Sequence, residues 1–130
     1  MQLHKSLYRD DVLNVVHEMY NPKLARKNIQ ARFDALARRH RREKNVGWGL
    51  ADRGDHWVFH SFGNHSGVKG RGAWCLDEVC ALADNISIEL QLWTASEALY
   101  PYYESFGFVR RRQMDGGVQW FDRSAAMEVA

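Results

Sequence analysis

Residues 56–92 contain a strand, a glycine-rich loop, a helix and a second strand in immediate succession. The segment 56–62 is rich in aromatic and β-branched residues, and 86–92 alternates apolar with polar residues, so both predict strands. Between them, apolar residues at helical spacing predict a helix over 73–84. Strands that alternate with a helix in this way are typical of the α/β class.

The flanking segments extend this order on both sides. The other expected elements are, in order, a strand at 2–7, helices at 11–20 and 22–43, a strand at 46–52, a helix at 96–106, and a hairpin of strands at 109–114 and 118–122. The predicted order is β, α, α, β, β, α, β, α, β, β. This order predicts one layer of mixed sheet flanked by helices.

Composition limits the kind of protein. A chain of 130 residues, 45% hydrophobic and 26% charged, is expected to bury one core in a single domain, residues 1–130. Its two cysteines, Cys75 and Cys80, exclude a disulfide scaffold and are expected to pack as thiols. No apolar run reaches the roughly 18–20 residues of a membrane span, and the first residues lack a signal-peptide stretch. A cytoplasmic location without membrane contact is therefore expected.

Three histidines, His56, His60 and His65, could indicate a metal site. Four residues of a strand span about 13 Å, which places His56 too far from His60 to share one zinc ion. No cysteine or carboxylate completes a ligand set, so no metal is expected.

Glycines cluster where the helix at 73–84 begins, in the loop 63–72. Glycine lets a backbone approach a ligand closely, and the free amides at a helix N-terminus attract anions. The loop is therefore a candidate phosphate site, although glycine-rich turns are usually only turns. It lacks the Gly-Lys-Ser/Thr ending of nucleotide-triphosphate loops, and no acidic residue ends the next strand as in dinucleotide-binding folds.

A second signal lies downstream, in the segment Leu-Tyr-Pro-Tyr-Tyr-Glu-Ser-Phe-Gly-Phe over 99–108, where Gly107 is placed to end a helix. The Tyr-x-x-x-Gly-Phe box that begins at Tyr103, together with Gly70-Arg71-Gly72 at a helix start, resembles the GCN5-related N-acetyltransferases. The resemblance covers about residues 46–122. It implies an acyl-CoA N-acyltransferase-like fold with a mixed, mostly antiparallel sheet. It also implies transfer of an acetyl group from acetyl-CoA to an amine by direct attack.

The resemblance implies where acetyl-CoA would bind. The pyrophosphate would be held by the loop and the helix start, through Gly67, Val68, Lys69, Gly70, Arg71, Gly72, Ala73 and Trp74. The pantetheine arm would lie along the strand end formed by Ser61, Phe62 and Gly63. Ser96 stands near a position where many members carry an asparagine that contacts the cofactor. Gly67 departs from the family, which usually has Gln or Arg there, and this departure removes a side-chain contact.

Two residues are candidates for proton transfer. Tyr103 matches the family tyrosine, whose hydroxyl would protonate the leaving thiolate, and a phenol with a pKa of about 10 is protonated at neutral pH. The alternative for Tyr103 is a core aromatic residue near a helix end. The strand at 56–62 holds no carboxylate, so His60 is the best-placed base, with a surface or structural histidine as the alternative.

Positive charge is concentrated in residues 23–44. This segment holds nine Lys or Arg against two acids, a net +7, so the rest of the chain carries −5 within the total of +2. One interpretation is a solvated helix face. Another is a wall of the acceptor site, as the resemblance implies, that would favour an acidic or nucleic-acid-associated acceptor. A third is direct nucleic-acid binding, to which Arg110, Arg111 and Arg112 would add, although no aromatic interleaving supports it.

The leading hypothesis is an N-acetyltransferase whose amine acceptor, a protein or a small molecule, is not identified, and a homodimer is left open. One alternative is a degenerate protein of the same fold with a structural or host-interaction role, as in a bacteriophage, because fold does not fix function. The other is a nucleic-acid-binding module that uses the basic segment 23–44.

Overall fold

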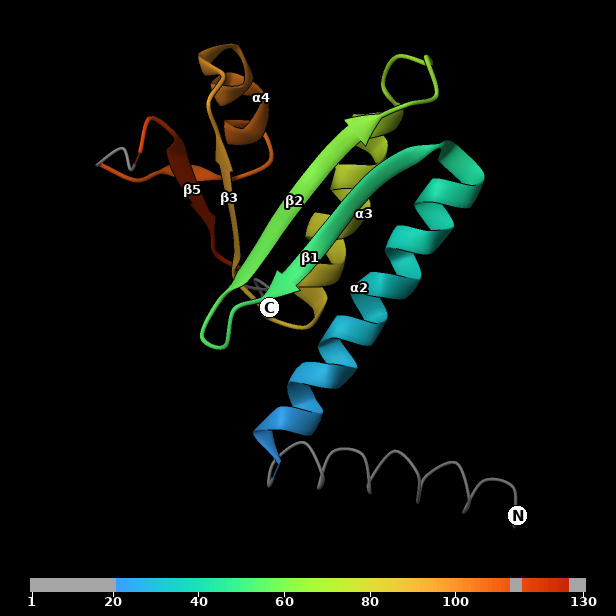
Figure 1. Ribbon diagram of the computed structural model, residues 1–130, viewed down its shortest axis with the longest axis vertical. Coiled ribbons are helices and arrows are strands. Elements are labelled where there is room, and N and C mark those ends of the chain that lie inside the picture. The colour runs from blue at the N-terminus through green and yellow to red at the C-terminus, as the bar shows by residue number, and fades with distance from the viewer. Residues whose placement is uncertain (1–20, 113–115, 127–130) are drawn as a thin grey trace. The chain divides into compact units, whose positions relative to one another are not determined.

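The computed structural model describes residues 21–112 and 116–126 (Figure 1). The chain divides between Arg32 and Phe33 into two compact units, and each is described by itself. The strand expected at 2–7 and the helix expected at 11–20 lie outside the described residues. Within the part of the chain that is described, no helix is long and apolar enough to cross a membrane.

The elements agree with the predicted α/β class. They are helix α2 (Pro22–Lys44), strands β1 (Val46–Asp52) and β2 (Trp57–Asn64), helix α3 (Arg71–Asn85), strand β3 (Leu90–Thr94), a 3-10 turn (Glu97–Leu99), helix α4 (Tyr100–Glu104), and strands β4 (Val109–Arg110) and β5 (Gln119–Arg123). The turn between β1 and β2 forms as expected, with Gly54 at φ 93 and its amide donating to the Asp52 carboxylate at 2.8 Å.

The strand predicted at 86–92 is wrong at its start. Helix α3 continues to Asn85, and the chain then turns through Ile86 and Ser87, where φ is 56° at Ser87. Ile88 is buried in this turn, and its amide donates to the carbonyl of Ala83 at 3.0 Å. The apolar alternation at the start of this segment therefore reflects burial of a helix-ending turn, and β3 begins only at Leu90.

The helix predicted at 96–106 is also shorter, since it divides into the 3-10 turn and α4. Gly107 ends this segment at φ 92, as its position predicted. Of the strand expected at 109–114, only Val109–Arg110 forms β4 among residues 109–112, and residues 113 and 114 lie outside the described residues.

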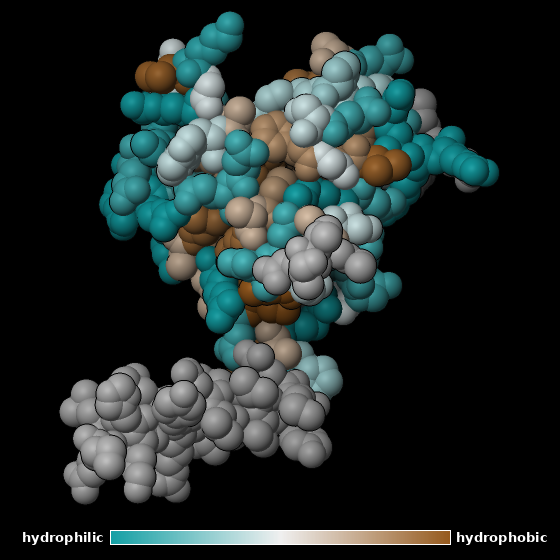
Figure 2. Space-filling view, turned by 180° about the vertical axis from the view of Figure 1, so that it is seen from behind, coloured by the Kyte–Doolittle hydropathy of each residue, from teal (hydrophilic) through white to brown (hydrophobic). Residues whose placement is uncertain are grey.

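The five strands form one mixed sheet in the order β1-β2-β3-β5-β4. The pair β2–β3 is parallel and the other three pairs are antiparallel. A parallel pair requires a crossover connection, and α3 supplies it between β2 and β3. Figure 1 shows α3 behind β1 and β2, and α4 at the upper end of β3. Seen from behind, in Figure 2, hydrophobic residues gather in the middle of the view with hydrophilic residues on both sides.

A buried arginine joins the end of β5 to α3 and to the end of the α4 segment. Arg123, 8% exposed, donates to both carboxylate oxygens of Asp84 at 2.8 and 3.0 Å and to the carbonyl of Phe106 at 2.7 Å. The hydrogen bonds from Arg123 hold the pKa of Asp84 below its usual value, against the opposing effect of burial. Arg123 therefore connects the end of β5 both to α3, through Asp84, and to the segment that follows α4, through Phe106.

We expect Arg123→Met to lower the free energy of unfolding by about 2–3 kcal/mol, because it leaves a partly buried carboxylate without its partner. The folded-state pKa of Asp84 is depressed, so its contribution is present above the unfolded-state pKa and is lost as pH falls through the folded-state value. The stability difference between wild type and variant, measured by urea denaturation, should therefore shrink at acidic pH.

The control for this variant is Arg110→Met, which breaks the more exposed Arg110–Glu104 pair at 3.6 Å. It should change the unfolding free energy by less than about 1 kcal/mol. Equal losses in the two variants, or a loss in Arg123→Met that does not depend on pH, would contradict this assignment.

Candidate functional site

The parallel strands β2 and β3 separate soon after they meet. Only Trp57–Leu90 and Val58–Gln91 are paired, although β2 continues to Asn64 and β3 to Thr94. Among the described strands, the edge of β2 beyond Val58 therefore has no partner on its β3 side. The N–H and C=O groups of such an edge can pair with another extended chain or an amide-bearing ligand.

A β-bulge lies within this open stretch of β2. Gly47 pairs with Gly63 and Gly49 pairs with His60, so Trp48 alone faces Ser61 and Phe62. Ser61 has φ 57, in the left-handed region that costs a non-glycine residue about 1 kcal/mol. The extra residue shifts the alternation of side chains, and the Phe62 ring meets that of Phe59, two residues before the bulge begins, at 5.5 Å between centroids.

The glycine-rich loop after β2 is held by its own side chains. The Asn64 amide group donates to the carbonyl of Val68 at 2.8 Å, and the Ser66 hydroxyl donates to the Asn64 side-chain oxygen at 2.6 Å. The Val68 amide in turn donates to the Ser66 hydroxyl at 3.0 Å. Gly67 and Gly70, at φ 73 and 90, provide the turns that lead into α3.

Helix α3 begins without a cap. Gly70 is the N-cap residue, no side chain bonds to the first turn, and no acidic residue lies in it. The backbone amides of Gly72 and Ala73 have no acceptor among the described residues. Lys69 and Arg71 flank the N-cap. Free amides at a helix N-terminus with two neighbouring cations favour an anionic ligand.

The helix start also lies close to Phe62, at the open edge of β2, and to Tyr102 of α4. A Cβ at Gly72 would lie 3.3 Å from Cζ of Phe62 and 3.9 Å from the hydroxyl of Tyr102. The Phe62 and Tyr102 rings are stacked, with centroids 6.4 Å apart. Burial raises the pKa of the Tyr102 phenol. The end of β2, the start of α3 and helix α4 therefore meet at Gly72, where a larger residue would disturb the contact.

Tyr103 lies beside Tyr102 in α4, packed among aromatic residues. Its ring is 8% exposed and contacts the rings of Tyr102, Phe108 and Phe121 at 5.5–6.1 Å. Burial raises the pKa of its phenol, so the hydroxyl is protonated at neutral pH. No described residue forms a hydrogen bond to this hydroxyl. Tyr103 therefore keeps a proton available for donation.

His60 is exposed and follows buried Phe59 in β2, so successive side chains place the two on opposite faces of the strand. Its Nδ1 lies 2.9 Å from the Ser61 hydroxyl, and its ring covers Gly49, where a Cβ would lie 2.6 Å from Cε1. Ser96 is exposed ahead of the 3-10 turn, and its amide donates to the Thr94 hydroxyl at 3.1 Å. The structure thus joins the strand end, the loop and α4, while His60 occupies the other side of β2.

A buried histidine that sequence reasoning missed links α2 to β1 and α3. Trp48 Nε1 donates to His40 Nδ1 at 2.9 Å, so His40 carries its proton on Nε2 and donates it to Glu78 at 2.8 Å. Arg39 also donates to Glu78, at 2.8 Å. Burial alone would raise the pKa of Glu78, but the hydrogen bonds from these two residues and the Arg39 charge hold it below its usual value. The one available signal was spacing, since His40 falls seven residues after buried Phe33 on one helical face.

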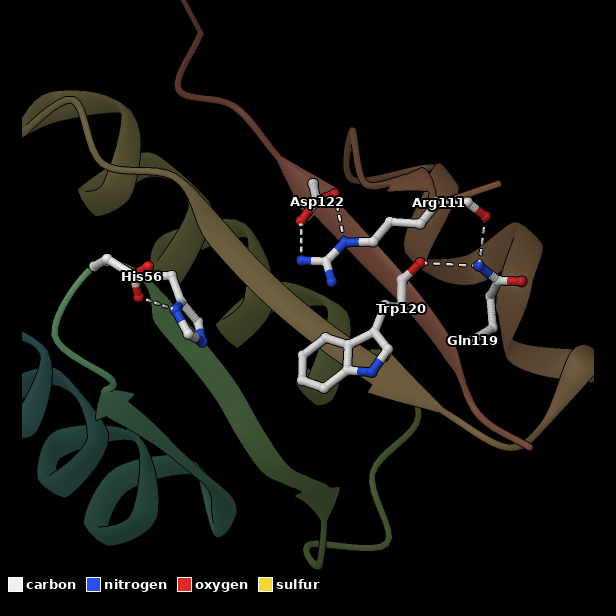
Figure 3. Close-up of polar contacts among 6 residues, drawn as sticks. His56, Arg111, Gln119, Trp120 and Asp122 are labelled. Atoms are coloured by element: carbon white, nitrogen blue, oxygen red, sulfur yellow. Dashed lines mark hydrogen bonds and ion pairs between the residues drawn. The ribbon is translucent and has the colours of Figure 1, made fainter. Parts of the chain in front are cut away.

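The sheet also has a face turned away from α3 and α4 (Figure 3). There Arg111 donates to both oxygens of Asp122 at 2.8 and 2.7 Å and lies over the Trp120 ring, 5.2 Å from its centroid. His56 Nδ1 lies against the Asp55 carboxylate, and Trp93 is the cross-strand neighbour of Trp120. The basic run 110–112 is therefore partly neutralised by ion pairs.

The remaining groups to consider are the two cysteine thiols and the side chains that could bind a metal. Cys75 and Cys80 are buried free thiols, as predicted, and burial raises the pKa of Cys80 to about 11. Across residues 21–112 and 116–126, no three His, Cys, Asp or Glu side chains gather as metal ligands would.

No protein-family model matches the chain, and a search of curated proteins finds no match. Function is therefore inferred from the open edge of β2, the uncapped loop and the tyrosines of α4.

We expect Ser61→Gly to raise the unfolding free energy by about 0.5–1 kcal/mol, because glycine adopts the positive φ of the bulge without steric cost. Ser87→Gly, at φ 56 outside this site, should have a similar effect. Ser96→Gly, at φ −100, should give no gain in chemical denaturation. A loss of stability in Ser61→Gly alone would show that the bulge does not adopt this conformation.

Proposed function

We propose that the protein is an N-acetyltransferase of the GCN5-related type, with an acyl-CoA N-acyltransferase-like fold, that transfers the acetyl group of acetyl-CoA to an amine. The observation that carries the proposal is the open edge of β2. This edge leads directly into a glycine-rich loop and then into the first turn of α3, which has no side-chain cap. An extended ligand with backbone-like amides at one end and a pyrophosphate at the other matches these two features in order. The single parallel pair in an otherwise antiparallel sheet supports the same fold.

The donor would be bound mainly by backbone groups. Ser61, Phe62 and Gly63 offer the unpaired edge to the amides of the pantetheine arm. The amides of Gly72 and Ala73 face the pyrophosphate, with Lys69 and Arg71 adding positive charge. These contacts explain how the chain could bind acetyl-CoA although Gly67 lacks the side chain that the family usually carries.

The chemistry requires one proton to be lost and one to be gained. The amine nitrogen attacks the thioester carbonyl carbon, a C–N bond forms, the C–S bond breaks, and the departing thiolate takes a proton. Tyr103 is the proposed donor, because burial keeps its hydroxyl protonated and no described residue forms a hydrogen bond to that hydroxyl. His60, exposed beside the bulge, is the proposed acceptor of the proton that the amine loses, so the amine would approach from the face of β2 opposite Phe59. A backbone amide of β2 would meet the oxyanion.

We expect acetyl-CoA to stabilise the folded protein, by about 2.7 kcal/mol at a hundredfold excess over Kd. The change is measured as the shift of the urea unfolding midpoint with increasing ligand. Inorganic pyrophosphate and sodium acetate at the same concentrations are the controls for a nonspecific anion effect, and should give a much smaller shift. A well-folded protein whose midpoint does not respond to acetyl-CoA would refute the proposed function.

We expect Tyr103→Phe to lower turnover by about 100-fold while leaving the Kd for acetyl-CoA nearly unchanged, because it removes the acid and keeps the ring. Turnover is measured as free thiol released from acetyl-CoA in the presence of a panel of amines. Tyr100→Phe, on the same helix and packed against Phe121 at 5.5 Å, is the matched control and should keep wild-type turnover. Equal losses of turnover and affinity would make Tyr103 a packing residue.

A further inference from the structure

Trp74 presents an aromatic surface beside the uncapped start of α3. It is the fourth residue of the helix and is 49% exposed. The Nζ of Lys44, the last residue of α2, lies 4.7 Å from the centroid of the indole, and the buried His40 ring meets the indole at 6.0 Å in an edge arrangement. A large ring that is held by neighbours and half open to solvent can stack with a planar ligand.

Positive charge converges on the same turn of α3. Lys44, Arg39 and Arg71 all lie near the Cys75 thiol, where they oppose the rise in its pKa that burial and Glu78 cause. Arg39 is bound to Glu78, whereas Lys44 and Arg71 have no ion pair among the described residues. Two of the three cations are therefore available to an anion at this turn.

The end of α2 is fixed to the glycine loop by a reciprocal pair of hydrogen bonds. The Asn45 side-chain amide donates to the carbonyl of His65 at 3.0 Å, and the His65 amide donates to the carbonyl of Asn45 at 2.9 Å. Asn45, at φ 52, ends the helix one residue after Lys44. Lys44 is thus held next to the loop by the backbone that follows it.

We propose that Trp74 and Lys44 bind the nucleotide end of coenzyme A, with the adenine stacked on the indole and the 3′-phosphate paired with the ammonium group. This inference rests on the proposed function, because the adenosine is joined to the pyrophosphate that the loop would hold. The nucleotide must therefore lie within a few bonds of the start of α3, where Trp74 and Lys44 meet. Lys44 has a flexible stem, so its ammonium can leave the indole for a phosphate.

This assignment gives the basic end of α2 a role in binding the donor. Arg39 is occupied by Glu78 and Arg42 lies 3.7 Å from Glu43, so the charge of the helix is not uniformly free. Lys44 combines an unpaired charge with an exposed aromatic neighbour. A ligand with a nucleobase next to a phosphate matches both, because the nucleobase can stack on the indole and the phosphate can pair with the ammonium group.

The test compares three ligands by isothermal titration calorimetry: coenzyme A, dephospho-coenzyme A, and S-acetyl-phosphopantetheine. Trp74→Leu should weaken binding of the first two about tenfold, the effect of losing one stacked base, and leave the third unchanged. Lys44→Met should weaken coenzyme A by roughly three- to fivefold and leave dephospho-coenzyme A unchanged. Trp74→Phe should recover most of the lost affinity.

Matched controls separate binding from folding. Trp93→Leu removes another exposed tryptophan, 52% exposed in β3, and Lys27→Met removes an exposed lysine elsewhere on α2, and neither should change any affinity. Circular dichroism and thermal melting monitor the fold of each variant, and a variant that does not fold is replaced by Trp74→Phe or by Lys44→Gln.

The outcomes distinguish the inference from the function on which it rests. If Trp74→Leu weakens all three ligands equally, or if Lys44→Met weakens coenzyme A and dephospho-coenzyme A equally, the nucleotide site is wrong and the proposed function stands. The same holds if neither variant changes any affinity. If the folded wild type binds none of the three ligands, both are overturned.

Discussion

The early separation of the parallel strands β2 and β3 is the constraint on which the rest of the site depends. A parallel pair normally continues for the length of its strands, because each lost pairing leaves backbone groups without partners. Here two paired positions are followed by six residues of β2 with an open edge. The two halves of the sheet are held instead by α3, which connects them, and by the stacking of Phe62 on Tyr102.

The bulge at Ser61 and the glycine at 72 are consequences of that separation. The bulge brings the Phe62 ring against Phe59 and Tyr102, and Gly72 leaves room for it at the helix start. A positive φ at Ser61 is tolerated because β1 fixes the residues on both sides, through Gly49–His60 and Gly47–Gly63. Within β2, the positive φ thus falls in the stretch where the edge is open.

Much of this arrangement could be predicted from local patterns, because spacing and turn residues determine where an element begins and ends. Helix α3, the β1–β2 hairpin and the turn at Gly107 follow from such patterns, and all three are present. Local patterns could not predict three other features, because each depends on residues from different elements. These are the divergence of β2 from β3, the bulge, and the His40–Trp48 hydrogen bond. At Ile86 and Ile88 a local pattern gave a wrong prediction. Apolar residues in a helix-ending turn produced the same alternation that a strand would show.

The basic segment shows most clearly why position matters more than total charge. Counted along the sequence, it is a block of +7 that could attract many anionic partners. In the structure, Arg39 is paired with Glu78, which also binds buried His40, and Asn45 ends the helix so that Lys44 lies next to the glycine loop. A charge placed over an exposed indole would select a ligand by shape as well as by sign. The chemistry of this segment is therefore set by where α2 ends rather than by how many cations it carries.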